Sequence, residues 1–138
     1  KKMSSGVGVS DECIEKFQEL KLGHKHQFII FKLNDDNTEV IVEKTAEPGT
    51  SYDDFQGSLP ANDCRYAVYD FEYEVDGGKR NKLVFAVWAP DSSKIKSKML
   101  YASSKDNFRK KLVGIGTEIQ ATDASEIAHE EVLEKILR

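Results

Sequence analysis

The sequence predicts a single domain of the α/β (α+β) class, in which helices cover a mixed β-sheet. Strand-length runs of apolar or alternating residues recur between residues 27 and 89, and segments of helical periodicity precede, separate and follow them. Of its 138 residues, 39% are hydrophobic and 32% are charged, which is the balance of an ordinary globular protein able to bury its own core. We expect one domain over residues 4–138, with Met3 as the natural start and Lys1-Lys2 left from expression, the alternative being that these two lysines are native.

The first half of the chain predicts a helix, a β-hairpin and an irregular connection. The nearly continuous apolar run QFIIFKL is typical of a central strand, and the turn Asp35-Asp36-Asn37 joins it to a partner. Gly23 is expected to end the first helix, while Pro48 and Pro60 disfavour long regular elements after the hairpin. The expected elements are a flexible arm at 4–10, a helix from Ser10 or Asp11 to about Leu22, strands at 27–33 and 38–44, and a short helix within 52–59.

The second half predicts a long hairpin, a long helix, an edge strand and a final helix. Residues 65–75 alternate apolar and acidic side chains, which predicts a strand buried on one side with its carboxylates facing solvent. Asp76-Gly77-Gly78 is a tight-turn signal, and beyond it Arg80 and Lys82 should share one face of the hairpin tip. The expected elements are strands at 65–75 and 82–89, a helix at 94–112, a strand at 117–121, and a helix at 125–138 in which Glu134 and Arg138 can pair.

The long helix has two contrasting sides. Residues 94–112 contain no Gly or Pro, and Gly114 follows as an expected C-cap. Three residues could cap its start: Asp91, Ser92 or Ser93. The side expected to face the core carries Ser97, Tyr101, Ser104, Phe108 and Leu112. Met99 lies about 160° away from Tyr101 around the helix, among Lys96, Ser103, Asp106 and Lys110. This setting indicates a surface that another molecule covers, although isolated exposed apolar residues are common.

The same stretch is strongly basic. From Asp91 to Val113 the chain carries seven Lys and Arg residues against two Asp residues, a net charge of +5, whereas the whole chain carries −4. This asymmetry favours an acidic protein surface or an anionic headgroup as the partner. Nucleic acid is disfavoured, because the chain is negative overall and its basic helix has no interleaved exposed aromatic residues.

Catalytic and metal-binding patterns are weak. His24 and His26 could share a strand face as metal ligands, but no Cys or carboxylate stands at ligand spacing beside them. Cys13 and Cys64 fit neither a metal pattern nor a disulfide framework, and we expect reduced thiols in a cytosolic protein. The sequence lacks the common nucleophile, phosphate-binding and zinc-protease motifs, and no apolar run has membrane-spanning length. We therefore expect a binding module and no enzyme, cofactor or metal, with a small enzyme or metal protein as the alternative from another class.

Four long motifs carry a family resemblance. They are MSSGVGVSD, LPANDCRYAVYDFEYE, GGKRNKLVF and KSKMLYASSKDNFRKKL. Together they resemble the actin-depolymerising factor/cofilin family, in the same order and over essentially all of residues 4–138. The resemblance implies the actin-depolymerising-factor homology fold, a mixed sheet of five or six strands flanked by helices on both faces. It also implies a protein that binds monomeric and filamentous actin, prefers the ADP form, and severs and depolymerises filaments.

The resemblance also implies roles for particular residues. Contacts to the actin monomer are implied for Ser5, Gly6, Lys96, Lys98, Met99, Asp106, Arg109 and Lys110. Contacts made only in the filament are implied for Arg80, Lys82, Glu134, Lys135 and Arg138. Inhibitory phosphorylation is implied at Ser5. Inhibitory binding of phosphatidylinositol 4,5-bisphosphate is implied at Lys96, Lys98, Lys105, Arg109 and Lys110.

Two family features are missing from this sequence. Thr117 stands where some animal members carry a pH-sensing histidine, which puts that switch in doubt, and the polybasic nuclear-import insertion of those members is absent. We expect a monomeric protein of the cytoplasm and cytoskeleton, with the nucleus as an alternative location. The alternative function within this fold is that of a non-severing member that binds filaments or actin-related complexes, but the basic hairpin tip and the Met-containing helix favour cofilin.

Overall fold

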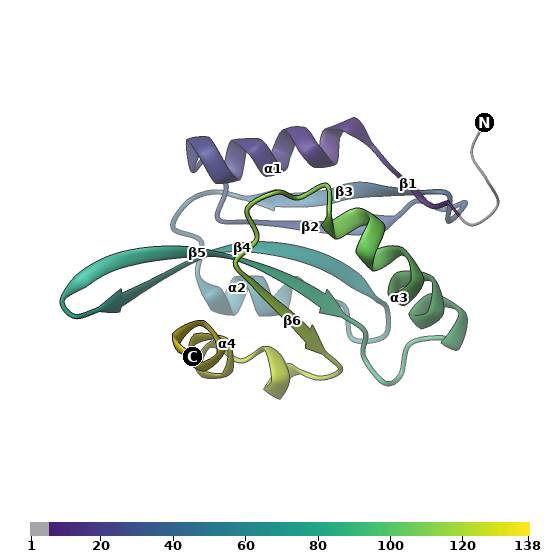
Figure 1. The fold of residues 1–138 in the computed structure, drawn as a ribbon. Helices are drawn as coiled ribbons and strands as arrows, with labels where there is room; N and C mark the ends of the chain where they lie inside the picture. Colours follow the sequence, from purple (N-terminus) through teal and green to yellow (C-terminus); the bar gives the residue numbers. More distant parts are fainter. Residues whose placement is uncertain (1–5) are drawn as a thin grey trace.

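Six strands form one mixed sheet in the order β1-β3-β2-β4-β5-β6 (Figure 1). The computed structural model describes residues 6–138. The strands are β1 (Gly8–Val9), β2 (Phe28–Leu33), β3 (Glu39–Ala46), β4 (Arg65–Val75), β5 (Gly78–Trp88) and β6 (Thr117–Ala121). The inner pairs are antiparallel, whereas β1 pairs parallel with β3 at one edge and β6 pairs parallel with β5 at the other. The predicted mixed sheet is confirmed.

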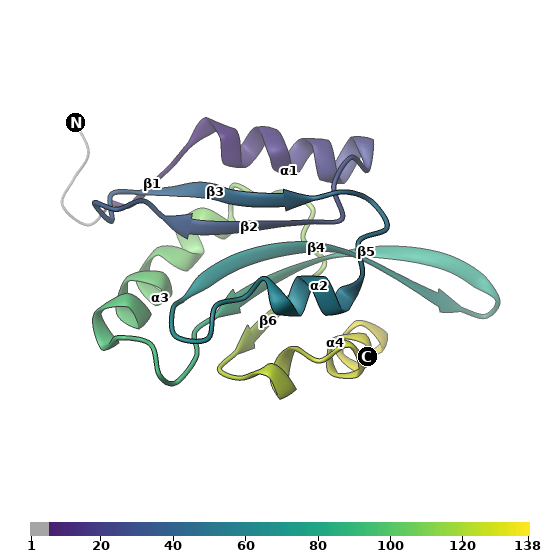
Figure 2. The ribbon, with the colours of Figure 1, turned by 180° about the vertical axis from the view of Figure 1, so that it is seen from behind.

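Helices cover both faces of this sheet, as predicted (Figures 1 and 2). They are α1 (Asp11–Gly23), α2 (Tyr52–Gly57), α3 (Ile95–Arg109), the 3-10 helix η1 (Ala124–Ile127) and α4 (His129–Leu137). Buried residues of α1 and α3 join one hydrophobic cluster, whereas those of α2 and α4 join a second cluster. The fold therefore has an α1/α3 face and an α2/α4 face, separated by the sheet.

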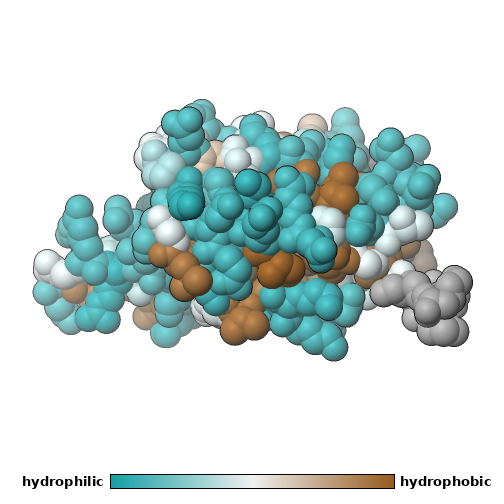
Figure 3. All heavy atoms as spheres, turned by 90° about the horizontal axis from the view of Figure 1, so that it is seen from above, coloured by the Kyte–Doolittle hydropathy of each residue, from teal (hydrophilic) through white to brown (hydrophobic). Residues whose placement is uncertain are grey.

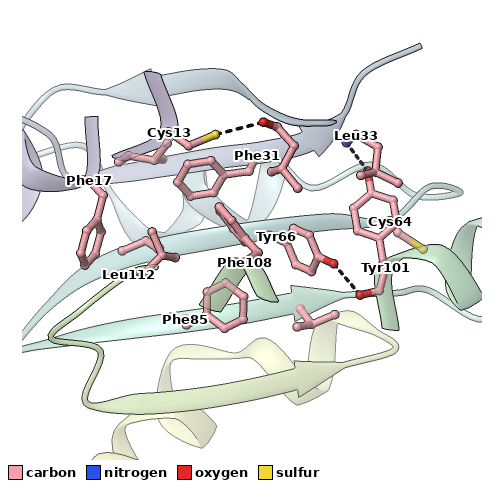
Figure 4. Close-up of a cluster of buried hydrophobic side chains, with 14 of the residues drawn as sticks. Cys13, Phe17, Phe31, Leu33, Cys64, Tyr66, Phe85, Tyr101, Phe108 and Leu112 are labelled. Atoms are coloured by element: carbon pink, nitrogen blue, oxygen red, sulfur yellow. Dashed lines mark hydrogen bonds between the residues drawn. The ribbon is translucent and has the colours of Figure 1, made fainter. Parts of the chain in front are cut away.

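Aromatic packing docks α3 onto its face of the sheet (Figure 4). The ring of Phe108 lies 4.9 Å from that of Phe31 and 5.1 Å from that of Tyr66, measured between centroids. The buried hydroxyl of Tyr101 accepts a hydrogen bond from the Leu33 backbone N–H at 3.0 Å, and the Tyr66 hydroxyl donates to the Tyr101 carbonyl. Because these polar groups are paired inside the core, they fix the position and rotation of α3 as well as stabilising it.

The β4–β5 hairpin is long, and its tip extends beyond the other strands (Figure 1). Asp76 and Gly77 both have positive φ angles, 53° and 78°, which is the signature of a two-residue type I′ turn. The tight turn predicted from Asp76-Gly77-Gly78 is therefore confirmed, but β5 begins at Gly78 rather than at residue 82. The predicted second strand was too short because its first residues are polar and pair beyond the covered part of the sheet.

The prediction that β4 is buried on one side only is wrong for its first part. Residues 66–71 are all buried, because helices cover both faces of the sheet there, and alternating exposure begins only at Glu72. Asp70 was expected to face solvent but is 6% exposed. Its carboxylate accepts a hydrogen bond from the Asn81 side chain at 3.0 Å and lies 3.2 Å from His24 Nδ1.

The long helix is shorter than predicted at both ends. Lys94 is the N-cap of α3 and makes no side-chain capping bond. Neither expected serine caps the helix. Ser92 Oγ lies 2.6 Å from Asn62 Oδ1 in another loop, and Ser93 is buried. After Arg109, two hydrogen bonds of the i→i+3 type replace α-helical ones and bring Leu112 into the core as predicted. Gly114 lies beyond this turn, so it does not cap the helix.

Both ends of the chain also differ from prediction. Gly8 and Val9 pair with Glu39 and Val40, so part of the predicted flexible arm is an edge strand. Residues 125–128, expected to be α-helical, belong to a 3-10 turn and an extended residue, because Asp123 Oδ1 accepts a bond from the Glu126 N–H at 3.1 Å and caps the turn. Val132 and Ile136 face the core.

Candidate functional site

The outward side of α3 forms the first candidate surface. We call this the α3 surface, and it comprises Ile95, Lys96, Met99, Ser103, Asp106 and Lys110. Met99 is 65% exposed, and Ile95, which sequence reasoning missed, is 74% exposed. With Lys96, Leu100 and Ser103 these two residues line a shallow, open depression of about 380 Å³. The repeat 95, 99 is the i, i+4 spacing of one helix face, and it could have identified Ile95.

Charges at the start of α3 oppose the helix dipole. The first turn contains no acidic residue, and the N-cap has no side-chain hydrogen bond. Instead, Lys94 and Lys96 are exposed near the positive end of the helix. Each such cation costs about 0.3–1 kcal/mol relative to a favourable charge. Proteins tend to break such local rules at functional sites, so this helix start is a candidate for a binding surface.

The predicted cations of α3 fall into two groups. Lys96 and Lys110 are exposed and make no side-chain hydrogen bond or ion pair within residues 6–138. Lys98 Nζ donates to the Asp91 carbonyl at 2.9 Å, which holds it against the preceding loop. Lys105 and Arg109 both pair with Glu118 on β6, at 2.8 Å and 2.9 Å. Sequence reasoning missed Glu118, since only the fold brings β6 beside α3.

This ion-pair cluster shifts the pKa values of Lys105 and Glu118. The hydrogen bond from Lys105 to the Glu118 carboxylate raises the pKa of Lys105. For Glu118, partial burial acts to raise the pKa, but the hydrogen bond and charge of Lys105 and the charge of Arg109 outweigh it and lower the pKa. Lys105 and Glu118 are therefore charged at neutral pH, and Lys105 also lies 3.8 Å from the carboxylate of Asp106 on the α3 surface.

The N-terminal segment lies next to α3. Asn107 Nδ2 donates to the Val7 carbonyl at 3.3 Å, and Gly8 N–H donates to the Thr38 carbonyl at 2.9 Å. Gly6 is half-buried. The structure thus brings the predicted site residue Gly6 near the α3 surface, whereas Ser5 lies outside the described residues.

The second candidate surface lies at the hairpin tip and on α4. We call this the hairpin surface, and it comprises Arg80, Lys82, Glu134, Lys135 and Arg138. In the β4–β5 ladder Lys82 stands opposite Phe71, and Phe71 stacks on His129 of α4 with ring centroids 4.8 Å apart. Opposite residues share a face, so Arg80 and Lys82 point to the α2/α4 face, as their predicted common orientation requires. On α4, Glu134 and Arg138 form the predicted pair at 3.9 Å.

Lys82 is more restrained than Arg80. Its aliphatic stem lies against the backbone at Gly116, where a Cβ atom would come within 2.8 Å of Lys82 Cγ. Arg80 is exposed. The hairpin surface therefore combines one cation held along its stem with one that is free to adjust.

The two candidate surfaces belong to opposite faces of the sheet. The α3 surface stands on the α1/α3 face, and the hairpin surface is formed on the α2/α4 face. Seen from the α1 side, the molecule is largely hydrophilic with separated hydrophobic patches (Figure 3). This arrangement permits two partner molecules to be contacted at once.

The histidines and cysteines considered for catalysis or metal binding do not converge on one site in the described part of the chain. His24 lies beside Asp70, whereas His26 Nε2 lies 2.8 Å from Glu19 Oε1, so the two histidines face different carboxylates. In the part of the chain that the structure describes, no group of three or more His, Cys, Asp or Glu side chains could hold a metal ion. Cys13 and Cys64 are free thiols buried in the core, and burial raises the pKa of Cys13 to about 11.

No helix within residues 6–138 has the length and apolar character that crossing a membrane requires.

Comparison with known proteins identifies the family. Residues 6–137 match the family described as cofilin/tropomyosin-type actin-binding protein. Cofilin of Mycosarcoma maydis is 61% identical over 137 residues, covering 99% of this chain and 98% of the relative. Actophorin of Acanthamoeba castellanii is 57% identical over 131 residues, covering 95% of each.

Solved structures agree with this match. The crystal structure of Streptomyces griseoflavus cofilin superposes with a TM-score of 0.90 at 57% identity, covering 95% of this chain and 97% of that one. Plasmodium berghei actin depolymerization factor 2 superposes with a TM-score of 0.86 at 33% identity, covering 99% and 100%. The match also supports the expectation of a binding protein rather than an enzyme. This chain belongs to the actin-depolymerising factor/cofilin family of actin-binding proteins.

Proposed function

We propose that this protein binds actin monomers through the α3 surface and the N-terminal segment, and binds filaments by adding the hairpin surface. In this proposal it prefers ADP-bound actin, and it severs and depolymerises filaments. The observation that carries the proposal is the pair of charged, exposed surfaces on opposite faces of one sheet, with Met99 and Ile95 exposed on the first.

The α3 surface has the composition of a contact with an apolar centre and a charged rim. Met99 and Ile95 would enter an apolar cleft on actin, and Lys96 and Lys110 would pair with carboxylates around it. Truncating a buried anchor typically costs about 2 kcal/mol or more, while rim charges act mainly on the association rate. Because the core bonds of Tyr101 fix α3, these side chains are presented without rearranging the helix.

The hairpin surface would contact a neighbouring subunit of the filament. A ligand that binds one filament twist better shifts the filament toward that twist, by no more than its differential affinity. Strain at boundaries between decorated and bare segments would then favour breakage. No step requires covalent chemistry.

Regulation would act on the same α3 region. Phosphate on Ser5 would add about −1.5 to −2 charges to a segment beside acidic partner groups, and repulsion would weaken binding. Phosphatidylinositol 4,5-bisphosphate would compete through Lys96, Lys98, Lys105, Arg109 and Lys110. A pelleting assay of Ser5→Asp tests the first idea, since unchanged affinity for actin would contradict it.

The decisive experiment for severing is fluorescence microscopy of labelled filaments with added protein. Fragmentation and shortening support the proposal. Stable decorated filaments would instead favour the alternative, a non-severing protein of the same fold. We propose a monomeric protein of the cytoplasm and cytoskeleton.

A further inference from the structure

Glu118 holds two cations of α3 with its two carboxylate oxygens. Oε2 accepts a hydrogen bond from Lys105 Nζ at 2.8 Å, and Oε1 lies 2.9 Å from Arg109 Nε. The side chains are partly shielded from solvent, with exposed fractions of 27% for Glu118, 21% for Lys105 and 34% for Arg109. Ion pairs that are shielded in this way, with each carboxylate oxygen meeting its own cation, are better ordered than fully exposed pairs.

The sheet explains why Glu118 reaches α3. In β6, Ile119 and Ala121 point into the hydrophobic cluster of the α2/α4 face. Because strand residues alternate, Glu118 points the other way, and its ladder partner Phe85 belongs to the core under α3. Glu118 therefore points toward α3, where it meets Lys105 and Arg109.

The contact with Arg109 leaves part of the guanidinium free. Oε1 of Glu118 lies closest to Nε, and within residues 6–138 the guanidinium forms no ion pair with any other residue. A guanidinium presents several donors in a rigid fork, so a contact at Nε orients the remaining donors. Those donors have the geometry that a partner carboxylate accepts in a bidentate pair.

We propose that Glu118 is a positioning residue beside the actin-binding α3 surface: it holds Arg109, the chain neighbour of Lys110 in that surface, so that its terminal guanidinium nitrogens are ready to bind a carboxylate of the partner. This inference rests on the proposed function of the α3 surface. Lys105 supports the arrangement by occupying the second oxygen of Glu118.

The direction in which Glu118→Gln changes the affinity for actin distinguishes a positioning role from a purely electrostatic one. Replacing Glu118 by Gln removes a negative charge beside a surface that would meet acidic groups, so electrostatic steering alone predicts faster and tighter binding. If Glu118 positions Arg109, the variant should bind more weakly. Without the carboxylate the Arg109 side chain is unrestrained, and it must then be immobilised when the complex forms. Immobilising one long side chain on binding corresponds to about a 3- to 10-fold loss of affinity.

The test is a titration of fluorescently labelled actin monomers with purified variants, each checked by thermal unfolding. Glu118→Gln should weaken binding about 3- to 10-fold. Glu15→Gln makes the same charge change on an exposed residue of α1 and should leave the affinity unchanged. An affinity of Glu118→Gln equal to or tighter than that of the unmodified protein overturns the inference.

A double-mutant cycle separates positioning from a general structural role. In an Arg109→Gln background, Glu118→Gln should have no further weakening effect, because there is no guanidinium left to orient. An equal loss in both backgrounds contradicts the proposal. Arg109→Lys provides a second variant that does not alter Glu118: it keeps the charge but lacks the fork, and should also bind about 3- to 10-fold more weakly.

The same titration distinguishes this inference from the underlying function. If the unmodified protein does not bind actin monomers, the proposed function fails. If it binds and Met99→Ala weakens binding while Glu118→Gln and Arg109→Lys do not, the α3 surface stands and the role of Glu118 is wrong.

Discussion

Met99→Ala should weaken actin-monomer binding and leave the fold intact. Burying a complete methionine side chain contributes about 1.5–3 kcal/mol. Because 65% of Met99 is exposed in the free protein, about two thirds of that energy is available to a partner. The expected loss is about 1–2 kcal/mol, or roughly a 5- to 30-fold increase in Kd. The free energy of unfolding should change by no more than about 0.5 kcal/mol, since exposed positions tolerate such changes.

The assay is equilibrium titration of labelled ADP-actin monomers, accompanied by urea unfolding of each variant. Leu22→Ala is a matched control, because Leu22 is also a helical apolar residue and is 72% exposed on α1. It should bind actin like the unmodified protein. The reasoning is refuted if Met99→Ala binds normally, or if Leu22→Ala loses as much affinity.

Three further predictions concern stability and reactivity. Tyr101→Phe should lower the free energy of unfolding by about 1–3 kcal/mol in urea titration, because the buried Leu33 N–H loses its acceptor; an unchanged stability would contradict this. Glu118→Gln should be less stable than the unmodified protein at neutral pH, and the difference should close in acid: the lowered pKa of Glu118 means that its contribution is complete above the ordinary value of 4.5 and is lost as the pH falls through the folded-state value. A pH series of thermal unfolding checks this, and a gap that persists in strong acid would oppose it. Cys13 and Cys64 are buried, and burial raises both pKa values, so a thiol reagent at pH 8 should label them only as fast as the protein opens; rapid labelling of the folded protein would show that the core is accessible.

The sequence patterns predicted the elements well where one physical signal dominates. The apolar run of β2, the Asp76-Gly77 turn and the 3.6-residue periodicity of α3 each depend on residues close together in the chain. The exposure of Met99 followed from the same periodicity.

The errors arose where distant elements meet. Asp70 looks like a solvent-facing residue of an alternating strand, and only the approach of His24 and Asn81 shows that it is buried and bonded. Ser92 and Ser93 look like helix caps, but the loop around Asn62 uses one and the core covers the other. Glu118 carries no local signal of its contact with Lys105 and Arg109, because β6 and α3 meet only through the sheet.

The central claim is that the two surfaces have different partners, and one comparison tests it directly. Arg80→Ala/Lys82→Ala and Lys96→Ala/Met99→Ala are each measured for monomer binding by titration and for filament binding by co-sedimentation. The hairpin pair should keep its monomer affinity and bind filaments about tenfold more weakly, as expected for two contacts of about 0.7 kcal/mol each. The α3 pair should lose both activities. If the hairpin pair loses monomer and filament binding equally, the division into two surfaces is wrong.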